Sequence, residues 1–224
     1  LYTLTATTSP IVVTSTEAIL LRILPKDALL GSLEYLEVGE ETERETLLEK
    51  LVSNGYLRTS LVEERGDFAV RGGVIDIFPP LYDDPLRLEF WGDRLESIRY
   101  FDPLSQRSTR HLKELVLLPA NEIITDRVRV KRARSLGRLP SAFQDTGSFP
   151  GQEGWLLHFY SHLDTLFDYL PSNGLLFLLD PHRIENESER FIERFQRDEE
   201  RYRQEAEGRQ NPFPETDGIL VSKN

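Results

Sequence analysis

The sequence contains no cysteine and no methionine among its 224 residues, and only 4 histidines. Without cysteine, disulfide bonds, thiolate metal sites and cysteine nucleophiles are excluded. Positive charge is also in short supply, since 27 lysine and arginine residues face 38 aspartate and glutamate residues and the net charge is -11. Proteins that bind the phosphate backbone of nucleic acid usually carry the opposite sign. The composition therefore disfavours direct nucleic-acid binding by the chain as a whole.

Long apolar runs and targeting patterns are lacking as well. No stretch approaches the roughly 20 apolar residues of a membrane span, and the start LYTLTATTSP lacks the basic region of a signal peptide. We therefore expect no membrane partner and a cytoplasmic location. With 29% charged and 39% hydrophobic residues, the chain has the composition of a globular protein that can bury one large or two small cores.

Sequence patterns for catalysis are missing too. The phosphate-binding pattern GxxxxGK[ST] does not occur, and Gly72-Gly73 lies in a strand-like run with no lysine nearby. The pair His158 and His162 has no carboxylate that would complete a metal site, and no GxSxG nucleophile elbow is present. We therefore expect no enzyme activity, no cofactor and no bound metal.

The most informative stretch runs from Gly66 to Tyr100. Apolar and polar residues alternate in two parts of it, which predicts strands with one buried and one exposed face. The apolar positions are Phe68, Val70, Leu86, Leu88 and Phe90. Gly92-Asp93-Arg94 predicts a tight turn that joins the last two strands into a hairpin. Arg71-Gly72-Gly73 favours a strand with a glycine bulge over a piece of an RNA-binding RGG box, which needs several copies.

Charged residues occupy the exposed positions of this predicted sheet: Arg71, Arg87 and Glu89, with Arg58 on the preceding segment. The planar guanidinium of arginine forms paired hydrogen bonds with carboxylates, so such a face suits an acidic partner. The alternative is a solvated sheet face whose cross-strand ion pairs contribute little. Without further information the residues favour this alternative.

The flanking segments predict strand–helix units at both ends of the chain. Strands are predicted at 11–14, 32–38, 56–63, 111–118, 155–160, 175–179 and 219–221. Helices are predicted at 17–23, 40–54, 127–136, 163–169 and 183–207, with a long loop at 137–154. The layout indicates an α/β domain, made of residues 1 to about 20 and about 111 to 224, that is interrupted by an α+β insert.

The stretch FAVRGGVIDIFPP, followed by LRLEFWGDRLESIRYFDPLSQRS, resembles the N-terminal UvrB-homology region of the bacterial transcription-repair coupling factors, the Mfd family. Arg71-Gly72-Gly73, Trp91 and Gln106-Arg107-Ser108 favour this family over UvrB itself. The resemblance implies a degenerate helicase-like (UvrB-like) α/β domain interrupted by a small α+β insert with an antiparallel sheet. It divides the chain into residues 1–20 (end of domain 1a), 21–110 (UvrA-docking domain 2) and 111–224 (domain 1b).

The resemblance also implies a function. The chain would be a non-catalytic interaction module that recruits UvrA, the damage-recognition protein of nucleotide excision repair, to stalled RNA polymerase in transcription-coupled repair. RNA polymerase and DNA would be contacted by other parts of the longer, ATP-driven translocase. UvrA would be met by Arg58, Arg71, Arg87 and Glu89, while Ala69 stands where UvrB has a further arginine.

Two other residue sets remain open. Phe78 is a candidate apolar anchor for UvrA, and its alternative role is a core residue. The basic segment 127–138, with Arg129, Lys131 and Arg132, is a candidate for direct DNA contact. Its alternative is a solvated helix face, because no aromatic residues are interleaved to stack on bases. A nucleotide-binding fold with residual affinity is a third interpretation.

Overall fold

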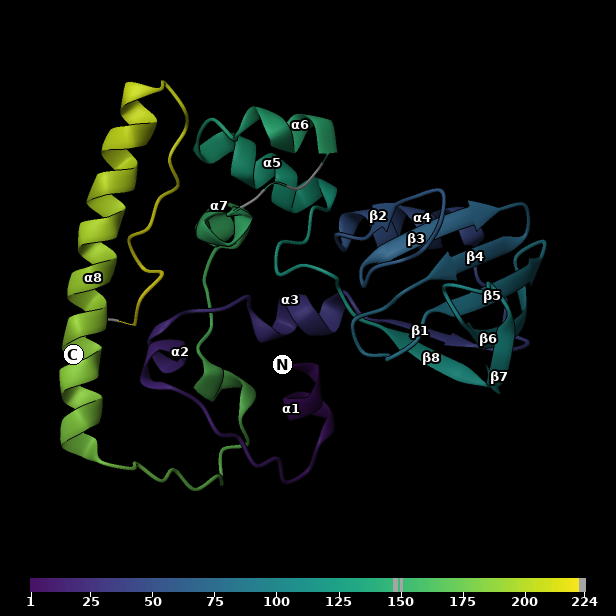
Figure 1. Cartoon of the computed structure of the whole chain (residues 1–224), viewed down its shortest axis with the longest axis horizontal. Coiled ribbons are helices and arrows are strands. Elements are labelled where there is room, and N and C mark those ends of the chain that lie inside the picture. The colour runs from purple at the N-terminus through teal and green to yellow at the C-terminus, as the bar shows by residue number, and fades with distance from the viewer. Residues whose placement is uncertain (147–148, 150, 222–224) are drawn as a thin grey trace. The chain divides into compact units, whose positions relative to one another are not determined.

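The computed structural model describes residues 1–146, 149 and 151–221. The chain divides into two compact units (Figure 1). The central unit is Asp27–Val130, and the outer unit combines Leu1–Lys26 with Lys131–Asn224. The boundaries differ from the predicted ones, because residues 111–130 lie in the central unit and not in the outer one. The reason is strand pairing, which ties residues 108–112 and 114–117 to strands of the central unit.

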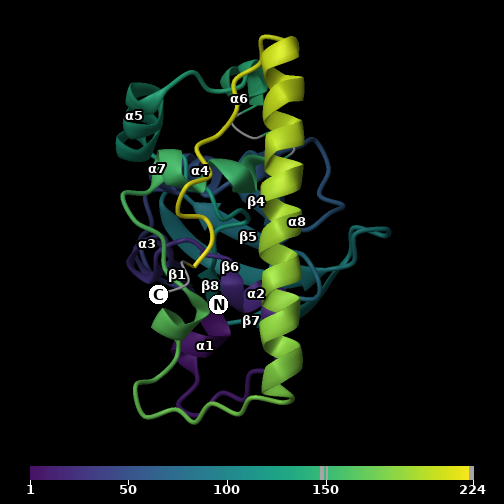
Figure 2. The same ribbon diagram turned by 90° about the vertical axis from the view of Figure 1, so that its left-hand side faces the viewer.

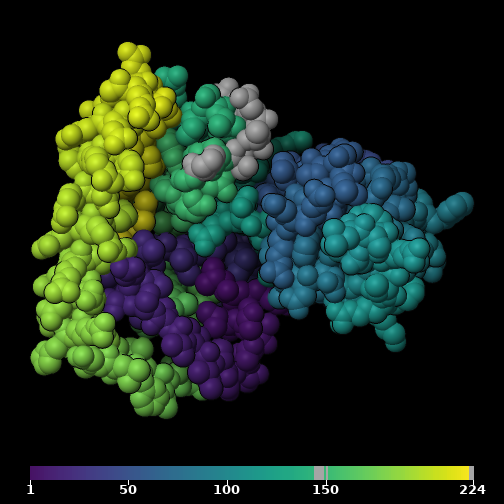
Figure 3. Space-filling view, in the orientation of Figure 1, coloured from purple at the N-terminus to yellow at the C-terminus, as the bar shows by residue number. Residues whose placement is uncertain are grey.

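The central unit contains a six-stranded sheet of order β2-β3-β4-β5-β6-β7, in which β2 and β3 are parallel and the other neighbours antiparallel. Its strands are β2 Leu57–Arg58, β3 Asp67–Arg71, β4 Val74–Ile77, β5 Leu86–Trp91, β6 Arg94–Phe101 and β7 Ser108–Leu112. A second, two-stranded sheet pairs β1 (Glu34–Glu37) with β8 (Glu114–Leu117). In space-filling view the blue-to-teal unit is one continuous packed body (Figure 3).

The predicted alternation decides which side of the sheet is buried. Leu86 and Leu88 are 0% and 1% exposed, whereas Arg87 between them keeps partial exposure. Helix α4 (Arg44–Ser53) contributes Leu47 and Leu51 to the same core cluster. Because its apolar residues recur on one face, this helix matches the predicted amphipathic segment at 40–54, although it begins four residues later.

Glycines make both hairpins of this region. The prediction of a turn at Gly92-Asp93 is confirmed, with Gly92 at φ 62 between β5 and β6. The predicted bulge at Gly72-Gly73 is wrong, since these residues form the turn that joins β3 to β4. Gly72 has φ 60, and a Cβ on Gly73 would lie 2.6 Å from the Phe90 carbonyl oxygen, so that both positions require glycine.

The outer unit is helical in its described residues. Its helices are α1 Tyr2–Ala6, α2 Thr16–Leu20, α6 Ser141–Thr146, α7 Leu156–Phe159 and α8 Pro181–Gly208, with 3-10 helices η1 Gln152–Trp155 and η2 Leu166–Tyr169. Helices α3 (Lys26–Gly31) and α5 (Arg127–Leu136) cross the two boundaries between the units. Figure 2 shows α8 as the long yellow-green helix, which contacts α2 through an Arg194–Glu17 ion pair of 2.5 Å. Searching the described residues finds no helix with the length and apolar character of a bilayer span.

The four strands predicted in the outer unit are absent from its described residues, and of the predicted strand 219–221 only an isolated bridge between Leu220 and Leu21 forms. Residues 155–160 fold largely into α7, where Phe159 packs against Phe143 at 5.5 Å between ring centres. A continuous apolar run has no period, so it fits a buried helix as well as a buried strand. Residues 11–14 and 175–179 are irregular, because no described strand pairs with either of them. The predicted loop 137–154 contains α6 and η1, while its residues 147, 148 and 150 lie outside the described part.

The chain as a whole therefore combines helices with antiparallel sheets, and the mixed α/β class is confirmed. Described residues of the outer unit form isolated bridges between Leu21 and Leu220 and between Ile23 and Asp164, and no longer strand.

Candidate partner-binding face

The charged residues of the central sheet gather on the side opposite its apolar core. Strand register explains this, because Asp76 is paired with Arg87, Arg87 with Arg99, and Glu89 with Ser97. Side chains of directly paired residues lie on the same side of a sheet. We call this side the charged face, defined by Arg71, Asp76, Arg87, Glu89 and Arg99.

Asp76 is the centre of the charged face and is 1% exposed. It accepts hydrogen bonds from Nε and Nη2 of Arg87, at 2.6 and 2.9 Å, and from Nη2 of Arg71 at 2.6 Å. Sequence reasoning missed this carboxylate, although a single acidic residue between Ile75 and Ile77 in the VIDIF run was a usable signal. A buried acid within an apolar strand needs cationic partners. Two arginines therefore converge on one carboxylate.

Hydrogen bonds and a ring contact fix the side chain of Arg87, which is only 18% exposed. Besides Asp76, it donates to the Gln106 carbonyl oxygen at 3.2 Å, and its guanidinium lies 4.7 Å above the Phe101 ring centre. The hydrogen bonds to Asp76 raise the pKa of Arg87, so this guanidinium remains charged. The expectation that Arg87 is a solvent-exposed residue is wrong, since its first role is to neutralise a buried acid.

Glu89 and Arg99 form a second ion pair on the same face. Glu89 also accepts a hydrogen bond from the Ser97 hydroxyl at 2.8 Å and keeps 38% side-chain exposure. The Nε of Arg99 is buried and has no hydrogen-bond partner among the described residues. Three arginines thus share two carboxylates, which leaves the charged face with an excess positive charge.

Arg71 and Arg58 have the most exposure of the predicted arginines. The side chain of Arg71 is 53% exposed, and its Nη2 donates a hydrogen bond to Asp76. Arg58 is exposed on the edge strand β2, where it is paired with Phe68 in parallel register. Because directly paired side chains lie on the same side and Phe68 lies in the core, this register assigns Arg58 to the core side of the sheet, opposite the charged face. The structure thus brings Arg71, Arg87 and Glu89 together but leaves Arg58 apart from them.

Phe78 lies beside a small apolar cluster made by Val62, Ala69 and Phe101. It is half-buried, and the Arg65 guanidinium lies 5.5 Å above its ring centre. Both roles considered from the sequence are compatible with this position, since part of the ring packs and part remains accessible.

The residues predicted to contact DNA lie on α5 and differ in accessibility. Arg129 is half-buried and forms an ion pair with Asp126, the residue whose carboxylate accepts hydrogen bonds from the first turn of the helix. Arg132 is half-buried with a buried Nε, and Lys131 is exposed. The three side chains therefore do not form a single exposed patch.

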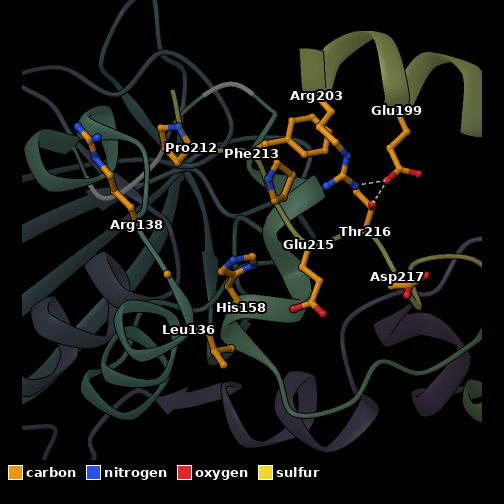
Figure 4. A pocket seen from close by; sticks show the side chains of 12 residues that line it. Leu136, Arg138, His158, Glu199, Arg203, Pro212, Phe213, Glu215, Thr216 and Asp217 are labelled. Carbon is orange, nitrogen blue, oxygen red and sulfur yellow. Dashed lines mark hydrogen bonds and ion pairs between the residues drawn. The ribbon is translucent and has the colours of Figure 1, made fainter. Parts of the chain in front are cut away.

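The outer unit has a cavity of about 660 Å³ between α7, α8 and the segment 212–217 (Figure 4). Glu199 accepts hydrogen bonds from Arg203 and from the Thr216 hydroxyl, both at 2.5 Å, which ties the segment to α8. His158 lies on the opposite wall, 6% exposed, and its Nδ1 has no partner among the described residues. No cluster of metal-ligating side chains occurs in the described ranges.

His158 should make the outer unit sensitive to mild acid. Burial lowers the pKa of His158 below its usual 6.5, Glu215 partly offsets this, and the charge of Arg132 adds to the decrease. The unfolded chain then protonates this imidazole more readily than the folded chain does. The contribution of neutral His158 to the free energy of unfolding is therefore fully present above about pH 6.5 and is lost as the pH decreases towards the lowered pKa. Urea unfolding from pH 7.5 to 5 should show a slope of up to about 1.4 kcal/mol per pH unit from this group. His158→Gln should remove this component and the exposed His162→Gln should retain it; equal slopes in both variants would contradict the assignment.

The sequence of the central unit is similar to that of a known protein family. Residues 35–123 match the family described as the UvrB interaction domain. This range lies entirely within the central unit and contains the whole charged face. Residues 35–123 thus belong to the UvrB interaction domains.

The larger part of the chain is similar to transcription-repair-coupling factors. The protein of that name from Myxococcus xanthus is 39% identical over 196 residues, which cover 77% of this chain and 16% of the relative. The Escherichia coli protein is 32% identical over 205 residues, 85% of this chain and 18% of the relative. UvrABC system protein B from Campylobacter hominis is 37% identical over 123 residues, 52% of this chain and 19% of the relative. The resemblance to coupling factors is therefore confirmed, and the chain spans less than a fifth of each relative.

Proposed function

We propose that this chain is a non-catalytic interaction module whose central unit binds UvrA in transcription-coupled DNA repair. The observation that carries the proposal is the match of residues 35–123 to the UvrB interaction domain, because that range contains the charged face. An excess of arginine over carboxylate on this face suits a partner surface rich in aspartate and glutamate. Arg71, Phe78 and Glu89 are the proposed contacts on and beside the charged face, and Arg87 supports them from within the sheet. Arg58 is a separate proposed contact from the exposed edge strand β2.

The surrounding architecture enters the proposal as well. The central unit corresponds to the UvrA-docking domain 2, and the outer unit to a degenerate, helicase-like domain made of parts 1a and 1b. Because the sequence has no GxxxxGK[ST] pattern, ATP hydrolysis would belong to other parts of a longer protein. Those parts would also contact RNA polymerase and DNA. Such partners imply a cytoplasmic location.

Capture of UvrA by the immobilised chain tests this function directly. We expect saturable binding of purified UvrA at micromolar concentration, weakened by salt because arginines contribute to the contact. The same preparation should bind duplex DNA weakly at physiological salt, as its net charge of -11 implies, and should not hydrolyse ATP. Tight DNA binding lost in Lys131→Ala, without capture of UvrA, would replace the proposal with the DNA-contact interpretation.

A further inference from the structure

The charged face ends in an exposed tryptophan. Trp91 is the last residue of β5, and the alternation of that strand assigns it to the same side as Arg87 and Glu89. Exposure increases along this row, from 18% for the side chain of Arg87 and 38% for that of Glu89 to 82% for Trp91. At about 3.3 Å per residue, the Cα of Trp91 lies roughly 7 Å beyond that of Glu89.

The fold does not require an aromatic side chain at this position. Gly92 and Asp93 form the turn of the hairpin, and the neighbouring core positions are filled by Phe90 and Leu95, which are 8% and 0% exposed. Backbone pairing with Arg94 holds Trp91 in the strand whatever its side chain. The indole therefore presents a large apolar surface to solvent without stabilising the core.

The surroundings of Trp91 resemble the edge of a binding site. The indole borders a shallow hollow of about 420 Å³. The hollow is lined by Arg44, Glu45, Gly73, Phe90, Trp91, Gly92 and Asp93. Arg44 is fixed at the rim because its Nη1 donates to the Gly72 carbonyl oxygen at 2.7 Å. Three glycines near the hollow, Gly72, Gly73 and Gly92, have no side chain that could cover the indole.

Register connects Trp91 with the exposed arginine of the charged face. Arg71 is paired with Val74, and Val74 with Glu89, so that Arg71 and Glu89 lie in one row across the sheet. Trp91 lies two residues further along β5, towards the same end of the sheet. An apolar group beside charged groups is the composition of interface hot spots, in which tryptophan and arginine are enriched.

We propose that Trp91 is the apolar anchor of the charged face and inserts into a cleft of the partner that is bordered by carboxylates. The inference rests on the proposed function, and the occupant to which it commits is UvrA. Continuity with the charged face and charge complementarity to its arginines support this choice. In this proposal the indole of Trp91 contributes apolar contact area with UvrA, and the charges of Arg71 and Glu89 orient UvrA on the charged face.

Substitution of Trp91 tests the anchor. Trp91→Ala should weaken UvrA binding by roughly thirty-fold or more, as expected for a hot-spot residue, while the thermal midpoint stays unchanged. Trp91→Phe should restore part of the affinity. Tyr202→Ala is a matched control, because Tyr202 is an exposed aromatic residue, 53% accessible, on the outer unit. This control should bind UvrA normally.

A second measurement follows the indole itself. The chain has two tryptophans, so 5-fluorotryptophan labelling gives two fluorine resonances. The Trp91 resonance should lose its dependence on H₂O or D₂O when unlabelled UvrA is added, and that of Trp155, 4% exposed, should not change. Normal capture by Trp91→Ala would overturn the anchor and leave the proposed function intact, as would a Trp91 resonance unaffected in the complex. Absence of capture by the unmodified chain would overturn both.

Discussion

Replacing Asp76 with alanine should lower the free energy of unfolding of the central unit by about 3–5 kcal/mol. The carboxylate is 1% exposed and binds Arg71 and Arg87, so its removal leaves two cations around an apolar hole. Arg71 can turn to water, but Arg87, with 18% side-chain exposure, cannot do so without disturbing the sheet. Urea unfolding monitored by circular dichroism measures the loss.

Two further variants make this result specific. Asp76→Asn keeps the size and one acceptor oxygen, so it should lose less stability than the alanine variant. Glu96→Ala removes an acid that pairs with Arg94 at the surface, where both side chains are more than half exposed, and should change stability by at most about 0.5 kcal/mol. Equal stability of Asp76→Ala and the unmodified chain would mean that the arginines do not depend on this carboxylate.

Arg71→Ala and Arg58→Ala should each weaken UvrA binding far more than they weaken the fold. An arginine paired with a carboxylate in a desolvated interface leaves that charge buried when it is truncated, at a cost on the order of 2 to 5 kcal/mol, or roughly 30-fold to several thousand-fold in affinity. Stability should decrease by about 1 kcal/mol or less, because Asp76 keeps both bonds from Arg87 and Arg58 is exposed. Titration of UvrA and thermal unfolding measure the two effects on the same samples.

Arg134→Ala provides the matched control, since Arg134 is exposed on α5 in the outer unit and should affect neither measurement. Arg87→Ala is a poor probe, because it unpairs Asp76 and would reduce capture through unfolding alone. The docking assignment fails if Arg71→Ala and Arg58→Ala capture UvrA normally, or if their losses of affinity follow their losses of stability.

The central unit could be predicted from the sequence because its information is local. Alternation at Leu86, Leu88 and Phe90, and the glycine turn after Trp91, specify strands and their connection within a few residues. The outer unit could be predicted only in part, since the expected helix 183–207 agrees with α8 whereas the expected strands are absent from the described residues. The runs 155–160 and 175–179 have no period, and whether such a run becomes helix, strand or neither depends on distant pairing partners.

The candidate site was only partly accessible to the same reasoning. Alternation in the sequence predicts that Arg71 and Arg87 lie on the polar side of the sheet. Their convergence on Asp76 follows from the cross-strand register, which a single sequence does not specify. Arg58 is predicted on the charged side, but its pairing with the core residue Phe68 in the two-residue strand β2 puts it on the other side, and a single sequence does not specify that register. Trp91 distinguishes this sequence from UvrB, but its exposure at the end of the charged face depends on the fold.

The exposed run Leu175–Leu179 has a practical consequence for concentrated samples of this chain. Its five apolar residues are 53–86% exposed, carry no charge and form no hydrogen bond within the described chain. Such a segment is a template for intermolecular β-pairing and fibril growth. The flanking Pro171 and Asp180-Pro181 act as gatekeepers that limit how far a fibril core can extend. We expect self-association through this run to increase with protein concentration, so the binding experiments should use dilute solutions.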